Sequence, residues 1–112
     1  MTLKEKIEHL DPETFDDFLS QLREMLDGVD LFLTKGEHAD EEELYEAFRL
    51  VHRCKGDAQF LALEETARIA RMMNGPMREA YQASRNLTQQ ERTVVTHGLE
   101  QMRAYWDLLS MT

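Results

Sequence analysis

Residues 40–58 read DEEELYEAFRLVHRCKGDA, and this segment decides the fold because its polar and apolar side chains follow the period of an α-helix. Asp40 and Glu43 have the spacing of a capping box, which predicts that the helix begins directly after Asp40. The apolar side chains recur every three or four residues and form one stripe: Leu44, Ala47, Phe48, Val51, Cys54 and Ala58. A helix with a single apolar stripe needs other helices against which to bury it.

Two neighbouring segments have the same periodicity. Asp11-Pro12 opens the first, since Asp is a favourable N-cap and proline is tolerated at the first helical position. Its apolar stripe continues to Leu33, and residues 34–39 are expected to form a connection. The other segment covers residues 61–84 and is interrupted at Gly75-Pro76. Because its apolar positions stay in phase across the interruption, we favour one kinked helix over two shorter ones.

The last predicted helix opens at Thr88, with Glu91 again at capping-box spacing. Four long helices joined by short connections predict an all-α fold, an antiparallel four-helix bundle. Residues 2–9 are a candidate for a short extra N-terminal helix. A chain of 112 residues has room for one core, so we expect a single domain that spans residues 1–112.

The composition restricts the classes of function. The net charge of −9 argues against nucleic acid and against an anionic membrane surface as partners. A single cysteine excludes an intrachain disulfide framework, and no apolar run approaches the roughly 20 residues that a membrane span needs. We therefore expect a cytoplasmic protein that is a monomer. No pair of histidines has the spacing of a metal site, so no metal or other cofactor is expected.

The candidate site lies at His52-Arg53-Cys54-Lys55-Gly56. A neutral imidazole keeps a free lone pair near neutral pH and can accept a phosphoryl group. His52 lies about 100° from the centre of the apolar stripe and should reach solvent. Lys55 is one helical turn away and could stabilise phosphate oxygens. Gly56 costs a helix interior about 1 kcal/mol relative to alanine, and steric clearance beside His52 is a reason for it.

Basic residues gather in the part of the chain around His52, whereas acidic residues dominate residues 1–46. A locally positive patch on an acidic protein is one interpretation, and ordinary solvated helix faces are the other. Cys54 lies on the flank of the apolar stripe, which favours a packed thiol over a redox centre. The basic residues concerned are Arg49, Arg53, Lys55, Arg68 and Arg71.

The segment His52 to Ala58 resembles the H-x-x-K-G signature of histidine phosphotransfer (HPt) domains, which include the phosphoacceptor domain of chemotaxis-type kinases. The likeness covers the order of helices in nearly the whole chain, but only about a dozen residues of motif. It implies that His52 carries a phosphoryl group, that Lys55 stabilises it and that Gly56 keeps the docking surface open. Gln59 could then hydrogen-bond the imidazole or the phosphate.

The resemblance also implies the partners. An HPt domain exchanges its phosphoryl group with the aspartate of a response-regulator receiver domain or takes it from a histidine kinase. Mg²⁺ and the acidic pocket belong to the receiver, so this chain would need no cofactor and would have no kinase activity of its own. Phosphoryl transfer depends mostly on positioning and charge stabilisation, which fits a carrier of this kind.

This sequence departs from the family at two positions. Ala62 stands where many members have a glycine near the start of the next helix. Asn74 stands where chemotaxis-type members have a glutamate that orients the histidine, and Arg71 could supply charge near the phosphate instead. Two alternatives remain open: an HPt-like interaction module that binds a receiver or kinase without being phosphorylated, and a structural bundle in which the motif is coincidental.

Overall fold

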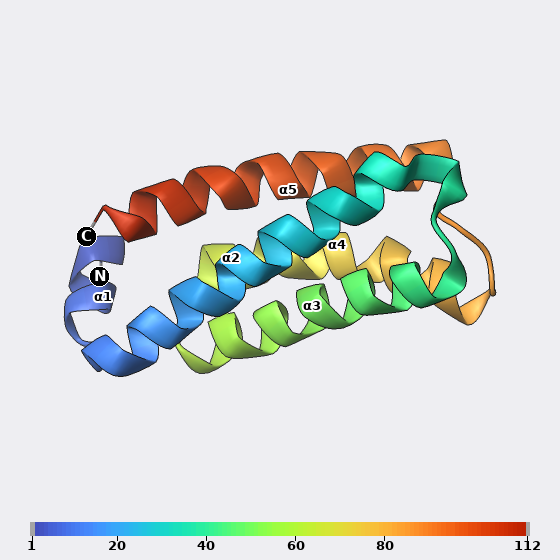
Figure 1. Ribbon diagram of the computed structural model, residues 1–112. Helices are drawn as coiled ribbons and strands as arrows, with labels where there is room; N and C mark the ends of the chain where they lie inside the picture. The colour runs from blue at the N-terminus through green and yellow to red at the C-terminus, as the bar shows by residue number, and fades with distance from the viewer. Residues whose placement is uncertain (1, 112) are drawn as a thin grey trace.

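Four long antiparallel helices form the body of the protein, as the sequence predicts (Figure 1). This computed structural model describes residues 2–111. A short helix, α1, folds across the end of the bundle at which both ends of the chain lie, which confirms the extra N-terminal helix. In chain order the elements are α1 (Leu3–Glu8), α2 (Pro12–Lys35), the 3₁₀ turn η1 (Gly36–His38), α3 (Glu41–Phe60), α4 (Glu64–Gln82) and α5 (Gln89–Ser110).

The predicted starts of α2, α3 and α5 are confirmed by their capping contacts. The Asp40 carboxylate accepts a hydrogen bond from the Glu43 backbone N–H at 2.8 Å, and the Glu43 carboxylate accepts one from the Asp40 N–H at 3.1 Å. Thr88 and Glu91 form the same reciprocal pair at the start of α5. Asp11 accepts from the Thr14 N–H, directly before Pro12. Each cap satisfies backbone donors that lack an intrahelical partner.

The packing of the helices leaves one face of α3 uncovered. α3 packs against α2 and α4, and α5 packs against the same two helices, so α3 and α5 lie diagonally across the bundle. The predicted apolar stripe of α3 is buried except at Phe48, which is half-buried, and Val51 and Ala58 are fully inaccessible to solvent. The side of α3 that points away from α5 is therefore the side on which His52 can meet another molecule.

The turn between α3 and α4 differs from the predicted boundary at residue 61. α3 ends at Phe60 and α4 begins at Glu64, because Ala62 adopts a φ of 57° and reverses the chain. The N–H of Ala62 donates to the Gln59 carbonyl, and that of Leu63 donates to the Ala58 carbonyl. This is a Schellman motif, in which glycine usually takes the left-handed position. The alanine thus adopts a left-handed conformation that glycine favours.

Two further expectations about the helices are decided by the structure. α4 continues through Pro76 as one helix, which confirms a single segment rather than two. The connection predicted at residues 34–39 is wrong for most of its length, because α2 extends to Lys35 and η1 covers residues 36–38, which leaves only residue 39 of that segment free of helix. Within residues 2–111, no helix combines the length and the apolar character that crossing a membrane requires.

Candidate functional site

His52 is exposed on the uncovered face of α3. Its ring lies against Phe48, one turn earlier on the same helix, with 5.9 Å between the ring centroids. Within residues 2–111 neither ring nitrogen has a hydrogen-bond partner. The imidazole is therefore supported from one side, while its nitrogen lone pair is left available for a reaction with a group that comes from solvent.

An aromatic cluster joins this part of α3 to α4. Phe48 stacks on Tyr81 of α4 at 6.1 Å, and Tyr45 contacts the same tyrosine ring at 5.1 Å. Aromatic pairs at these distances add stabilisation beyond the burial of their surface. Because Phe48 is held by Tyr81, it forms a fixed support for the His52 ring.

Gly56 leaves an open notch beside His52. A Cβ atom built on Gly56 would meet no atom within 4 Å, whereas one on Gly98 would collide with the buried side chain of Met73. Gly98 is thus required for helix packing, and Gly56 is not. The packing gives no reason for a glycine at position 56, and access to the neighbouring His52 stays a prediction from the sequence.

The basic residues on the α2 side of His52 are occupied in ion pairs. Arg53 of α3 binds Glu24 of α2 at 3.0 Å, and Arg49 binds Glu46 at 3.0 Å. The hydrogen bond from Glu46 raises the pKa of the Arg49 guanidinium. Arg53 therefore links α3 to α2, and Arg49 forms an ion pair within α3. The positive charges of both arginines are already balanced by carboxylates.

Helical register shows which candidates on α4 lie at the same level along the bundle as this part of α3. Seven residues advance an α-helix by about 10.5 Å and return to nearly the same face. Because α3 and α4 are antiparallel and Tyr45 contacts Tyr81, His52 and Asn74 lie at the same level two turns further along. The same arithmetic places Arg71 level with Lys55.

Three cations at the seam between α3 and α4 are not engaged in ion pairs, whereas Arg68 of α4 binds Glu65. Within residues 2–111 no carboxylate pairs with Lys55, Arg71 or Arg78. Arg78 lies one heptad after Arg71 on α4 and was not among the residues predicted from the sequence. One heptad step along α4 from Arg71, which the sequence had already pointed out, would have found it. The positive charge available to a phosphoryl group on His52 therefore comes from the α3–α4 seam rather than from the α2 side.

Asn74 has an unusual environment for a polar residue. Its side chain is 1% exposed, yet neither its amide nitrogen nor its amide oxygen has a hydrogen-bond partner. A buried polar group without a partner costs about 1–3 kcal/mol. Asn74 therefore does not hydrogen-bond His52 in this structure, although it lies at the level of that residue.

The remaining candidates make no contact that ties them to His52. Gln59 is exposed, and its side chain has no hydrogen bond within residues 2–111. Cys54 is buried, and burial raises the pKa of its thiol to about 12, with a further contribution from Asp57. The thiol therefore stays protonated, as expected for a packed residue. The residues from 2 to 111 hold no cluster of three or more metal-ligating side chains.

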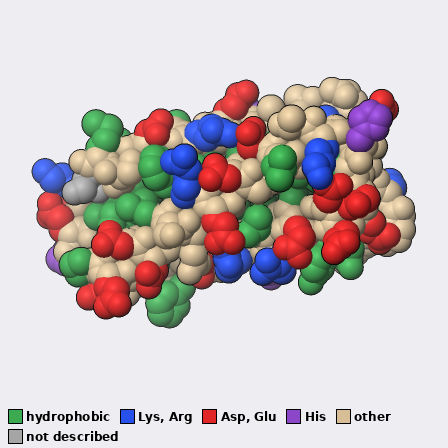
Figure 2. Space-filling view, in the orientation of Figure 1, with side chains coloured by type: hydrophobic (Ala, Val, Ile, Leu, Met, Phe, Trp, Pro, Cys, Tyr) green, Lys and Arg blue, Asp and Glu red, His purple; other side chains and the backbone are tan. Residues whose placement is uncertain are grey.

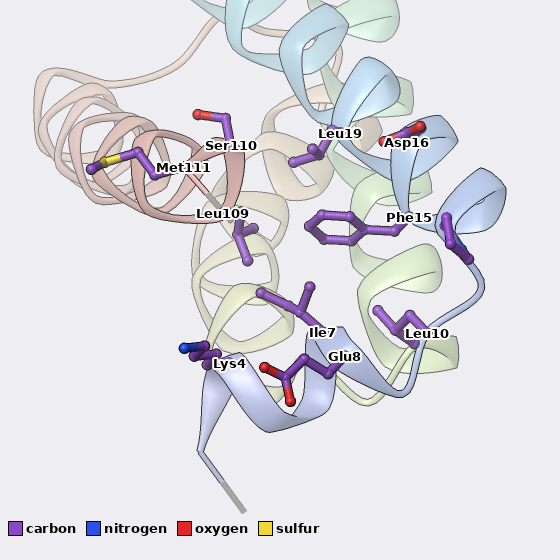
Figure 3. A pocket seen from close by; sticks show the side chains of 11 residues that line it. Lys4, Ile7, Glu8, Leu10, Phe15, Asp16, Leu19, Leu109, Ser110 and Met111 are labelled. Carbon is purple, nitrogen blue, oxygen red and sulfur yellow. The ribbon is translucent and has the colours of Figure 1, made fainter.

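A cavity lies elsewhere, at the end of the bundle beneath α1 (Figure 3). It measures about 750 Å³, and Phe15, Ile7 and Leu109 point into it from α2, α1 and α5. None of the predicted site residues lines this cavity. Figure 2 shows acidic side chains spread over the visible face of the molecule with basic ones between them, consistent with the acidic composition.

Comparison with known proteins identifies no relative. No family model matches this chain, and no curated protein or solved structure matches it either. The function has to be inferred from the site itself.

Proposed function

We propose that this protein is a phosphoryl carrier of a two-component phosphorelay, in which His52 accepts a phosphoryl group from a receiver aspartate and passes it on. The observation that carries the proposal is the position of His52: an exposed imidazole with unpartnered nitrogens, next to the open notch at Gly56. Lys55 and Arg71, which have no carboxylate partner within residues 2–111, supply positive charge at the same level of the bundle.

The proposed step is a direct transfer. A ring nitrogen of His52 attacks the phosphorus of the partner's aspartyl phosphate with its lone pair. The new P–N bond forms as the P–O bond to the aspartate breaks, and the electron pair of that bond leaves on the carboxylate. The proton on the other ring nitrogen stays on the ring or goes to water. Mg²⁺ is expected in the receiver, which makes this chain a carrier and not a kinase.

The proposed setting is the cytoplasm, where the protein would act as a monomer between a kinase or receiver and a second receiver. The interaction-only alternative shares the fold and the docking surface but not the chemistry. The unpartnered ring nitrogens of His52 favour the carrier, because a binding module has no need of a free nucleophile at its surface.

The test is phosphorylation by isolated receiver domains from the source genome. Each receiver is phosphorylated, mixed with the protein, and the protein is examined for phosphate that is labile in acid and stable in base, as a phosphohistidine is. His52→Gln should remove this label, whereas His97→Gln, which changes an exposed histidine on α5, should keep it. Equal labelling of the wild type and His52→Gln, or binding of a receiver without any label, would refute the carrier.

A further inference from the structure

Phe60 is the most exposed large apolar side chain in the described part of the protein. It is the last residue of α3, and 86% of its surface is accessible to solvent. Exposed large aromatic side chains are unfavourable in water, and at interfaces such residues often contribute much of the binding energy. The fold does not use this phenyl ring, which points to a partner outside the chain.

The position of Phe60 connects it with the reaction site. His52, Gly56 and Phe60 follow one another at intervals of four residues and form one ridge along the outer face of α3. Phe60 lies about 12 Å along the helix from His52, since each residue adds about 1.5 Å. Gly56 lies between them and offers no side chain, so a partner that enters the notch has an imidazole on one side and a phenyl ring on the other.

We infer that Phe60 is the apolar anchor by which this protein holds the receiver domain that exchanges phosphate with His52. The inference rests on the proposed function. A specific interface covers about 800 Å² on each partner, which corresponds to a disc with a radius of about 16 Å. A receiver that brings its aspartate to His52 therefore covers Phe60 as well. The matching surface on the receiver must be apolar and lie beside its aspartate pocket.

The experiment compares Phe60→Ala with Leu108→Ala in two assays. Leu108 is a matched control, because it is 53% exposed and belongs to α5, diagonally opposite α3. The first assay measures the rate of phosphoryl transfer from the receiver that labels the wild type fastest, as a function of receiver concentration. The second uses phosphoramidate, a small donor that needs no docking surface, and sedimentation velocity records the oligomeric state of each variant.

Phe60→Ala should raise the receiver concentration for half-maximal transfer about 10- to 100-fold, the effect of losing an interface anchor. Labelling by phosphoramidate should stay within twofold of the wild type, and Leu108→Ala should behave like the wild type in both assays. Transfer by Phe60→Ala at the wild-type concentration dependence would overturn the inference and leave the carrier function intact. A dimer of the wild type that Phe60→Ala dissociates would assign the ring to a second copy and overturn it too.

The two proposals fail in different ways. Should a receiver bind without labelling His52, the carrier function fails, and weaker binding of Phe60→Ala would still support the anchor. Should no receiver label or bind the wild-type protein, both proposals are wrong.

Discussion

Gly56 offers the sharpest test of why this helix carries a glycine. Because a Cβ at this position meets no atom within 4 Å, Gly56→Ala should stabilise the protein by about 1 kcal/mol, the difference in helix propensity between the two residues. A chain of 112 residues has an unfolding entropy of about 0.24 kcal/mol/K near 60 °C, so the melting temperature should rise by about 4 °C.

Gly98→Ala is the matched control in the same fold. Its new Cβ would collide with the side chain of Met73, which is fully buried. Overpacking of this kind costs about 1–3 kcal/mol, and it acts against the same gain in helix propensity. The two alanine variants should therefore differ in melting temperature by about 4–12 °C, measured by circular dichroism or calorimetry on both proteins side by side.

Gly56→Arg tests the need for open space beside His52 separately from the effect of the glycine on the stability of the fold. Arginine is nearly as good a helix former as alanine, so the variant should melt at or above the temperature of the wild type. Its long side chain fills the notch beside His52, and transfer from a phosphorylated receiver should fall at least about tenfold, a loss that corresponds to about 1.4 kcal/mol. Phosphoramidate should still label His52. A Gly56→Ala variant that is less stable than the wild type, or a Gly56→Arg variant with wild-type transfer, would refute the reasoning.

Three further predictions concern the bundle around the site. Asn74→Leu removes a buried amide without partners and should raise the free energy of unfolding in urea by about 1 kcal/mol, whereas a loss of stability would show that the amide has a partner in solution. Ala62→Gly should raise the free energy of unfolding by about 1 kcal/mol, because a φ of 57° is unfavourable for alanine and glycine adopts it freely. An unchanged urea midpoint would contradict this. Glu91 has its pKa lowered from 4.5 to about 2, chiefly by the hydrogen bond from Arg85, so its contribution is complete above pH 4.5 and is lost as the pH falls towards 2. The difference in unfolding free energy between the wild type and Glu91→Gln should therefore shrink over that interval, and a constant difference would speak against it.

Much of the fold could be predicted because its signals are local. The partners of the capping pairs at Asp40 and Thr88 are only three residues apart in the sequence, and both helices begin where those pairs predict. The apolar stripe of α3 follows from a period of 3.6 residues alone, and it is buried as expected at every position except the half-buried Phe48. The start of α4 was predicted at residue 61 instead of Glu64, because an alanine in the left-handed conformation cannot be recognised from the sequence as a glycine at a helix end can.

The candidate site was less predictable, because its properties depend on neighbours from other helices. Nothing local distinguishes Arg53, which is bound by Glu24 of α2, from Lys55, which has no carboxylate partner in the described residues. The sequence shows only that a polar residue, Asn74, stands on α4; its complete burial without a hydrogen-bond partner depends on how α4 packs. The exposure of Phe60 could not be predicted for the same reason, since only the packing of the helices leaves this side chain 86% accessible to solvent.

The sequence by itself therefore determined the helices, their order and the imidazole, lysine and glycine of the motif, because caps, periodicity and spacing act within one or two helical turns. Only the tertiary structure decided which of these groups face solvent and which are neutralised. The reason is physical: burial and ion pairing depend on side chains that are distant in the sequence, and these come into contact only when α3 packs against α2 and α4.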